Sequence, residues 1–120
     1  VPYTLEGTWK MFEVKESSSG ALTTKPSNVR GDVEITFTAT GNFSGVLVGH
    51  TPTNIISQGD YTTGINQMLT IPSLNITKLW ETPWGNEFVA NIRSAFAYHF
   101  DSNGNLIITT VDKMLIFERV

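Results

Sequence analysis

The chain has 120 residues, a formal net charge of −3 at pH 7 and no cysteine. A chain of this length can bury a substantial core, so residues 1–120 are predicted to form one domain. The lack of cysteine excludes disulfides, thiolate catalysis and zinc–thiolate sites. The acidic balance, without any basic cluster, argues against a nucleic-acid partner, and no apolar run is long enough to cross a bilayer.

The N-terminal region is predicted to be a strand followed by a polar connection. Residues 3–14 carry the apolar side chains of Leu5 and Trp9, with Gly7 as a predicted bend or bulge. Residues 16–28 are small and polar and are interrupted by glycine and proline. This composition is typical of a long connection, and we expect it to be the least ordered part of the chain.

The middle of the chain reads as a series of short strands. Apolar and polar residues alternate strictly through residues 32–40, which predicts a strand with one face on a core and one in water. Three further strands are predicted after it, separated by turns or loops: residues 43–48, 55–62 and 68–71. Gly59 is a predicted bulge, and residues 74–79 fit either a short strand or the entry to a helix.

One helix is predicted, over residues 84–96. Its apolar side chains recur at four-residue spacing: Trp84, Phe88, Ile92 and Phe96. Thr82 is the predicted N-cap and Pro83 the first helical residue, where the missing proline N–H is harmless. An apolar stripe on one side of a single helix must pack on something, so we expect it to close one end or one face of a curved sheet.

The last third completes the pattern with three strands, at residues 95–100, 105–110 and 111–119. The expected fold is therefore mainly β, or α+β: a small curved antiparallel β-sheet or barrel with one helix near residues 84–96. Its interior is predicted to hold eight large apolar side chains: Trp9, Phe37, Phe43, Leu69, Phe88, Leu106, Ile108 and Phe117.

The chain opens on Gly7-Thr8-Trp9, which is similar to the Gly-x-Trp start shared by the META domain family and the bacterial lipocalin-like domains. The later landmarks follow in the META order: Phe37, Phe43-Ser44-Gly45, Thr53-Asn54, Gly59-Asp60-Tyr61, Leu69-Thr70-Ile71, Thr82, Glu87-Phe88, Tyr98, Asn103-Gly104-Asn105-Leu106 and Met114-Leu115-Ile116-Phe117-Glu118-Arg119. META domains typically carry two cysteines that this chain lacks, so it resembles a divergent, cysteine-less relative.

The resemblance implies a location but no chemistry. Such domains are exported, often anchored through a lipidated cysteine upstream, and mostly of undefined biochemical role. We therefore expect a periplasmic or cell-surface protein, with a lipid anchor, where there is one, upstream of Val1. A start at Val1 rather than at methionine fits a mature exported fragment, and a cloning boundary would look the same. The family supplies no catalytic residues to carry over.

Neither a metal site nor a cofactor is predicted. His50 and His99 lie in different predicted elements, whereas a zinc site needs three or four ligands at short distance. The spacing of Asp101, Asn103 and Asn105 resembles the start of a calcium loop, but a strand follows directly, which favours a hairpin turn. No phosphate loop, nucleophile elbow or selected carboxylate pair is present.

The remaining candidates are aromatic side chains and one histidine. An exposed tryptophan at the mouth of a barrel is a usual way to hold a sugar or an apolar ligand. The structural alternative is that Trp84 fixes the helix to the sheet and that Trp80 covers the core. The candidate ligand-binding residues are Trp80, Trp84, His50, Tyr61 and Tyr98.

The predicted function is that of an exported bacterial envelope protein, a non-enzymatic module that binds a small apolar or sugar ligand or another protein. A small-ligand role requires a hollow of about 300 Å³ or more, and a tightly filled interior would favour protein contact instead. One alternative is a hydrolase acting on an envelope polymer, with two converging titratable groups. Another is a structural or chaperone-like interaction domain with an exposed apolar patch or strand edge.

Overall fold

The computed structural model describes residues 4–27 and 29–120, and in this part of the chain nine strands form one sheet. The predicted strand start at Tyr3 and connection end at Asn28 lie outside the described residues. The elements are β1 (Gly7–Glu16), β2 (Leu22–Thr24), β3 (Glu34–Ala39), β4 (Ser44–His50), β5 (Ile55–Gly64), β6 (Met68–Ile76), α1 (Pro83–Val89), the 3₁₀ turn η1 (Ile92–Ser94), β7 (Ala97–Phe100), β8 (Leu106–Thr109) and β9 (Lys113–Arg119).

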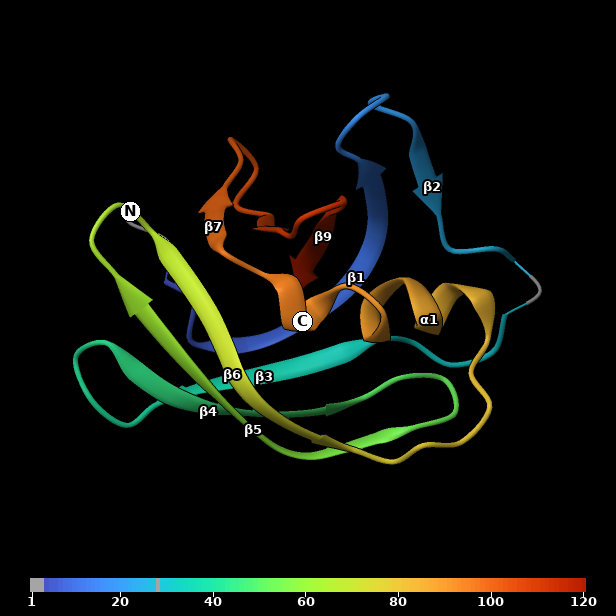
Figure 1. The fold of residues 1–120 in the computed structure, drawn as a ribbon. Coiled ribbons are helices and arrows are strands. Elements are labelled where there is room, and N and C mark those ends of the chain that lie inside the picture. The colour runs from blue at the N-terminus through green and yellow to red at the C-terminus, as the bar shows by residue number, and fades with distance from the viewer. Residues whose placement is uncertain (1–3, 28) are drawn as a thin grey trace.

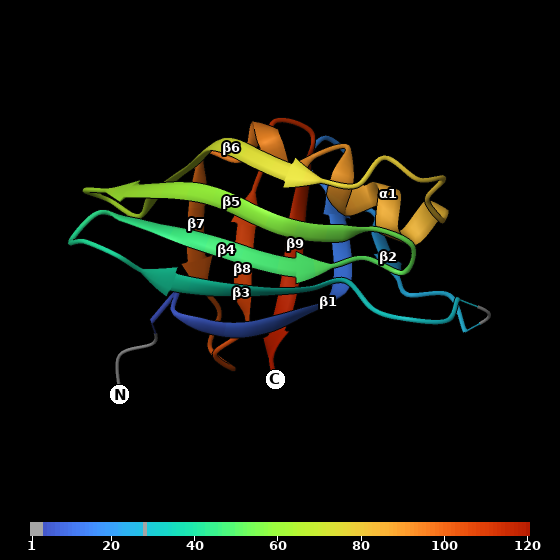
Figure 2. The same cartoon turned by 90° about the horizontal axis from the view of Figure 1, so that it is seen from below.

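The sheet closes on itself. Its order is β2-β1-β3-β4-β5-β6-β7-β8-β9, with every pairing antiparallel, and β1 also pairs with β9. In Figure 2, strands β3 to β6 run side by side as one layer and β7 to β9 cross behind them; in Figure 1, β7 and β9 lie above that layer. The predicted curved antiparallel barrel with one helix is confirmed. The seam between β6 and β7 is short, since Met68↔Ala97 is the single residue pair of its ladder.

Strand β1 belongs to both layers because it changes partners and bends. Its first residues pair with β3 and its last residues with β2, while β9 follows its other edge. A register shift between Met11 and Glu13 moves the buried positions from Trp9 and Met11 to Val14. Gly7 was predicted as a bend or bulge; it has a φ of +123°, while the register shift lies at Met11–Glu13, where an extra residue increases the bend of the strand.

The polar connection predicted over residues 16–28 also contains a strand. Residues of β2 pair with the end of β1, Glu13↔Thr24 and Lys15↔Leu22 among them. All three residues of β2 are exposed, so no alternation of apolar and polar side chains marks this strand in the sequence. The edge of β1 supplies the pairing partner, which composition alone cannot indicate.

Helix α1 closes one end of the barrel. The Thr82 hydroxyl accepts a hydrogen bond from the Gly85 N–H at 3.1 Å, and Pro83 begins the helix, as predicted. Trp84, Phe88 and Ile92 are at most 1% exposed and pack into the core.

The helix is shorter than the predicted span to Phe96. The Asn91 side-chain amide donates to the Glu87 carbonyl at 2.7 Å. In a continuing α-helix this carbonyl would accept from the backbone N–H of Asn91. The Asn91 N–H bonds to Phe88 instead, and the chain tightens into η1. Phe96 therefore lies beyond the helix and is 52% exposed.

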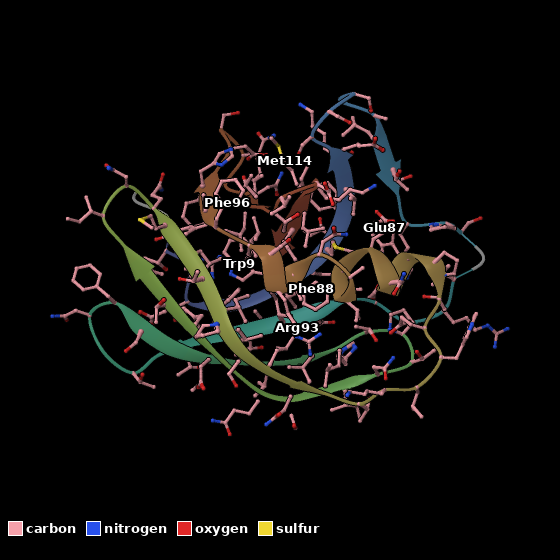
Figure 3. All side chains as sticks on the ribbon, viewed as in Figure 1. Trp9, Glu87, Phe88, Arg93, Phe96 and Met114 are labelled. Atoms are coloured by element: carbon pink, nitrogen blue, oxygen red, sulfur yellow. The ribbon has the colours of Figure 1, made fainter. Side chains whose placement is uncertain are left out.

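Side chains from both layers fill the barrel. Seven of the eight predicted interior residues are at most 1% exposed, and Figure 3 shows Trp9 and Phe88 between the layers. The eighth prediction, Phe43, is wrong: this side chain is 59% exposed in the turn before β4. The turn carries Phe43 past the edge of the sheet, so the alternation of β4 begins one residue later. Among the described residues, neither helix has the length and apolarity to cross a bilayer.

The end of the barrel opposite α1 is held by Arg119. Its guanidinium carbon lies 4.2 Å from the centroid of the Trp9 ring, and its nitrogens donate to the carbonyls of Glu6 (3.1 Å) and Thr4 (2.8 Å). Gly7 adopts a φ of +123°, and a Cβ there would overlap the guanidinium. The Gly-x-Trp opening is thus required for the packing of the two chain ends.

The two fully buried tryptophans at opposite ends of the barrel differ in one hydrogen bond. Trp9 Nε1 donates to the Leu5 carbonyl at 2.8 Å, whereas Trp84 Nε1 is buried without a partner among the described residues. Trp9→Phe leaves a carbonyl unpaired, and Trp84→Phe removes an unpaired donor. We expect Trp9→Phe to cost about 1–3 kcal/mol more unfolding free energy than Trp84→Phe, measured by chemical denaturation. Equal costs would contradict this difference.

Candidate functional site

The five candidate ligand-binding residues lie in four places. Trp80 is 76% exposed, between β6 and α1. Trp84 is 1% exposed and packs α1 into the core. Tyr61 and Tyr98 line one hollow at the end of the barrel opposite the helix. His50 is exposed at the end of β4.

The backbone around Trp80 is held by the side chain of Asn54. The Leu79 N–H donates to Asn54 Oδ1 at 2.8 Å, and Asn54 Nδ2 donates to the Leu79 carbonyl at 3.2 Å. The Thr53 hydroxyl donates to the Trp80 carbonyl at 2.6 Å. We call residues 78–81 the Trp80 ledge. Because Asn54 is only 3% exposed, its own bonds are partly shielded from water, and with the exposed Thr53 bond they fix the ledge against the β4–β5 loop.

Glu81 anchors the C-terminal end of the ledge. Its carboxylate accepts hydrogen bonds from the Thr51 hydroxyl, from Asn54 Nδ2 at 3.0 Å and from the Thr82 N–H at 2.8 Å. Burial by itself would raise the pKa of this carboxyl, but these donors outweigh it and hold the pKa below its ordinary value. Glu81 is therefore ionised and occupied by donors of the protein itself, which suits an anchor better than a catalytic base.

A hollow of about 430 Å³ lies between the Trp80 ledge and the helical segment. It falls within the usual size range of ligand sites. Its lining combines aromatic and aliphatic surface with cations and amides: Ile76, Lys78, Leu79, Trp80, Asn86, Val89 and Arg93 among others. We call it the Trp80 hollow. Arg93 comes from η1 on the side that faces β6, where its Nη2 donates to the Leu74 carbonyl at 3.2 Å (Figure 3).

The hollow at the other end of the barrel is smaller, about 250 Å³. Tyr61 contributes a side chain that is only 3% exposed and stands edge-on to Phe37, with ring centroids 5.1 Å apart. Burial raises the pKa of its hydroxyl. Tyr98 packs edge-on to Phe100 at 5.9 Å. Most of this aromatic surface is used for packing, and the volume lies below that of ordinary ligand sites.

His50 belongs to a row of charges on the outer face of the sheet. The strand registers place Glu118 beside Lys10, Lys10 beside Glu34, and Glu34 beside His50. His50 Nε2 lies 3.9 Å from the Glu34 carboxylate, and Lys10 Nζ lies 3.6 Å from that of Glu118. Alternating charges across strands contribute modestly to pairing, so the position of His50 is accounted for by the sheet.

The acidic and histidine side chains do not gather into a metal centre in residues 4–27 and 29–120, where no group of three or more could hold an ion. Asp101 closes the β7–β8 turn: its Oδ1 accepts from the N–H groups of Asn103 (2.8 Å) and Asn105 (3.0 Å). These bonds hold the pKa of Asp101 below its ordinary value, although its slight burial acts the other way. The hairpin turn favoured by the sequence is the one observed.

Apart from Trp80, the residues that line the Trp80 hollow were not among the sequence candidates, Asn54 and Arg93 among them. Asn54 was noted only as a landmark of the resemblance, although an asparagine in a Thr-rich loop is a frequent backbone-binding residue. Arg93 gave no signal, because in the predicted continuous helix it was one polar residue among several. Its position beside the ledge depends on the early end of α1.

Comparison with known proteins supports the fold but assigns neither a family nor a function. No family model matches the chain, and no curated protein matches it. The kinship with META domains therefore stays a prediction. A protein from Burkholderia xenovorans, solved by NMR, is similar in structure, with a TM-score of 0.67 and 15% sequence identity over 100% of this chain and 90% of that chain. At this identity the likeness is one of fold: a small β-barrel-like domain.

Proposed function

We propose that the protein is a non-enzymatic binding module that holds a sugar ligand in the Trp80 hollow, on the outside of the barrel. Its place in the bacterial envelope is part of the proposal and rests on the resemblance to exported META and lipocalin-like domains. The observation that supports binding is a tryptophan that is 76% exposed on a backbone held by hydrogen bonds from Asn54 and Thr53.

A fixed, exposed tryptophan is unusual unless it meets another molecule. An exposed tryptophan lacks the large favourable free energy that burial of its indole ring would contribute to folding. The hydrogen bonds of Asn54 and Thr53 restrict the ledge before any ligand arrives, which lowers the ordering cost of binding. The apolar face of a sugar ring packs on such a ring, while Asn86 lies in the same hollow to bond hydroxyl groups.

The interior of the barrel is a less suitable site. Trp9, Phe37, Trp84, Phe88 and Phe117 are each at most 1% exposed and occupy it. The external hollow, at about 430 Å³, exceeds the size that a small-ligand role requires. The ligand is therefore proposed to bind between the ledge and α1, with the barrel as a rigid support.

The hydrolase alternative is less well supported. Glu81 is the carboxylate of the Trp80 hollow, and its oxygens are engaged by Thr51, Asn54 and Thr82. A catalytic pair for glycoside hydrolysis needs a second carboxyl group within about 5–10 Å across the bound sugar. The lining of this hollow supplies none.

Tryptophan fluorescence provides a direct test. Trp9 and Trp84 are buried, so quenching by iodide reports mainly on Trp80. We expect a saturable, blue-shifted response to at least one of cellohexaose, mannohexaose, chitohexaose and hexagalacturonate. Calorimetry on Trp80→Ala should show a loss of affinity of roughly tenfold or more, since a stacking contact contributes about 0.5–1.5 kcal/mol beyond its buried area.

The matched control is Phe43→Ala, which removes another exposed aromatic ring at the opposite end of the barrel. Its affinity should equal that of the unmodified protein. Unchanged binding by Trp80→Ala, or the absence of any response across the four hexasaccharides, would overturn the proposal.

A further inference from the structure

The Trp80 hollow carries a net positive charge, because its lining holds two cations and the single carboxylate of Glu81. Lys78 and Arg93 both line it. In the part of the chain that the structure describes, neither forms an ion pair. The carboxylate of Glu81 is directed instead to Thr51, Asn54 and Thr82. Two unpaired cations in one hollow stand out in a chain whose formal net charge is −3.

Arg93 is positioned rather than free. It follows Ile92, which is fully buried, and precedes Ser94, whose hydroxyl donates to the Asn91 carbonyl at 2.9 Å. Its Nη2 donates to the Leu74 carbonyl on β6. A guanidinium has five N–H donors in a planar fork, so one bond to the protein leaves others directed at a ligand. The fork matches a carboxylate with two parallel hydrogen bonds.

The cations and the indole ring lie in one hollow, so a single ligand can use both. We infer that the ligand of this site is an acidic sugar, an oligosaccharide containing uronic acid. A pyranose ring lies on Trp80, and its carboxylate is bound by Arg93 and Lys78. This inference rests on the proposed function and adds the charge of the ligand to it.

The test compares hexagalacturonate with its fully methyl-esterified form, which has the same rings without the charge. We expect the acid to bind roughly tenfold more tightly than the ester at low ionic strength. The difference should shrink as salt is added, because exposed charges are screened within about 8 Å at 0.15 M. Isothermal titration calorimetry measures both affinities.

The double variant Lys78→Gln/Arg93→Gln is expected to bind the acid and the ester with equal affinity. The control Lys15→Gln/Arg30→Gln removes the same net charge elsewhere and should keep the tenfold difference. Melting temperatures of both variants establish that they remain folded.

Each result bears on one claim. Equal binding of acid and ester by the unmodified protein overturns the inference and leaves the proposed sugar site intact. A preference for acid that survives in Lys78→Gln/Arg93→Gln overturns the assignment of these residues. Tighter binding of a sulfated hexasaccharide of the same backbone overturns the carboxylate assignment. Failure of every sugar, neutral and acidic, removes the proposed function and the inference together.

Discussion

Replacing Asn54 with alanine is expected to lower the free energy of unfolding by about 3 kcal/mol, because several partly buried hydrogen bonds are lost at once. Its side chain, 3% exposed, donates to the Leu79 carbonyl and to Glu81, and accepts from the Leu79 N–H and the Thr77 hydroxyl. Alanine cannot replace any of these contacts. Urea denaturation measures the loss, with the exposed Asn75→Ala on β6 as the control.

The same substitution should abolish the order of the Trp80 ledge. The Leu79 N–H and carbonyl then lose their hydrogen bonds to the Asn54 side chain. Trp80 must therefore become ordered when the ligand binds. We expect sugar affinity to fall together with stability, because Asn54 holds the backbone of the ledge and also lines the hollow. Tight binding retained by a destabilised Asn54→Ala protein would contradict this positioning role.

The effect of Asn54→Ala should also depend on pH. The pKa of Glu81 is depressed in the folded protein, so its contribution to stability is present above the unfolded-state pKa and disappears as pH falls through the folded-state pKa. In Asn54→Ala one donor to the Glu81 carboxylate is lost, so the pKa of Glu81 is lowered less. The difference in unfolding free energy between the unmodified protein and Asn54→Ala should therefore be larger at pH 7 than at pH 3. A difference that grows in acid would contradict the assigned role of Glu81.

Gly49→Ala is expected to destabilise the barrel by about 3 kcal/mol or more, at the upper end of overpacking costs. Gly49 in β4 lies opposite Ile35 of β3. A Cβ at this position would overlap the Glu34 carbonyl oxygen and would lie 2.9 Å from the Ile35 Cα. These are backbone atoms of a paired strand, so relief requires that the β3–β4 ladder move apart.

Gly64→Ala at the end of β5 is the matched comparison. There a Cβ would meet only the Met68 side chain, at 3.6 Å, which is ordinary contact. We expect this change to alter the free energy of unfolding by less than about 0.5 kcal/mol. Thermal melts of the two variants measure the contrast. Similar losses in both would show that intrinsic strand preference, rather than the close approach of two backbones, dominates.

Much of the fold was predictable because the spacing of apolar residues along the chain indicates each strand and the helix. Strict alternation over residues 32–40 defines a strand with one buried face, and β3 follows from it. Trp84, Phe88 and Ile92 recur once per helical turn, and all three are buried where α1 and η1 meet the barrel. In these segments one periodicity accounts for both the backbone and the side chains that it buries.

The candidate site was predictable only in its aromatic residue. Trp80 was named because an exposed tryptophan binds ligands, but its exposure was one of two open alternatives. Asn54, which determines where Trp80 lies, is separated from Leu79 by 25 residues and meets it through the curvature of the sheet. Arg93 reaches the same hollow because Asn91 ends the helix early.

By itself the sequence determined the mainly β class, the turns and the apolar stripe of the helix, since these depend on neighbours along the chain. Only the tertiary structure decided that β1 pairs with β9, that Phe43 lies outside the core, and that the Trp80 ledge faces Arg93. The physical reason is that such contacts depend on how far the sheet bends before it closes. That bend is the sum of small twists and of register shifts in the β1–β9, β4–β5 and β5–β6 ladders, so it cannot be predicted from any short segment.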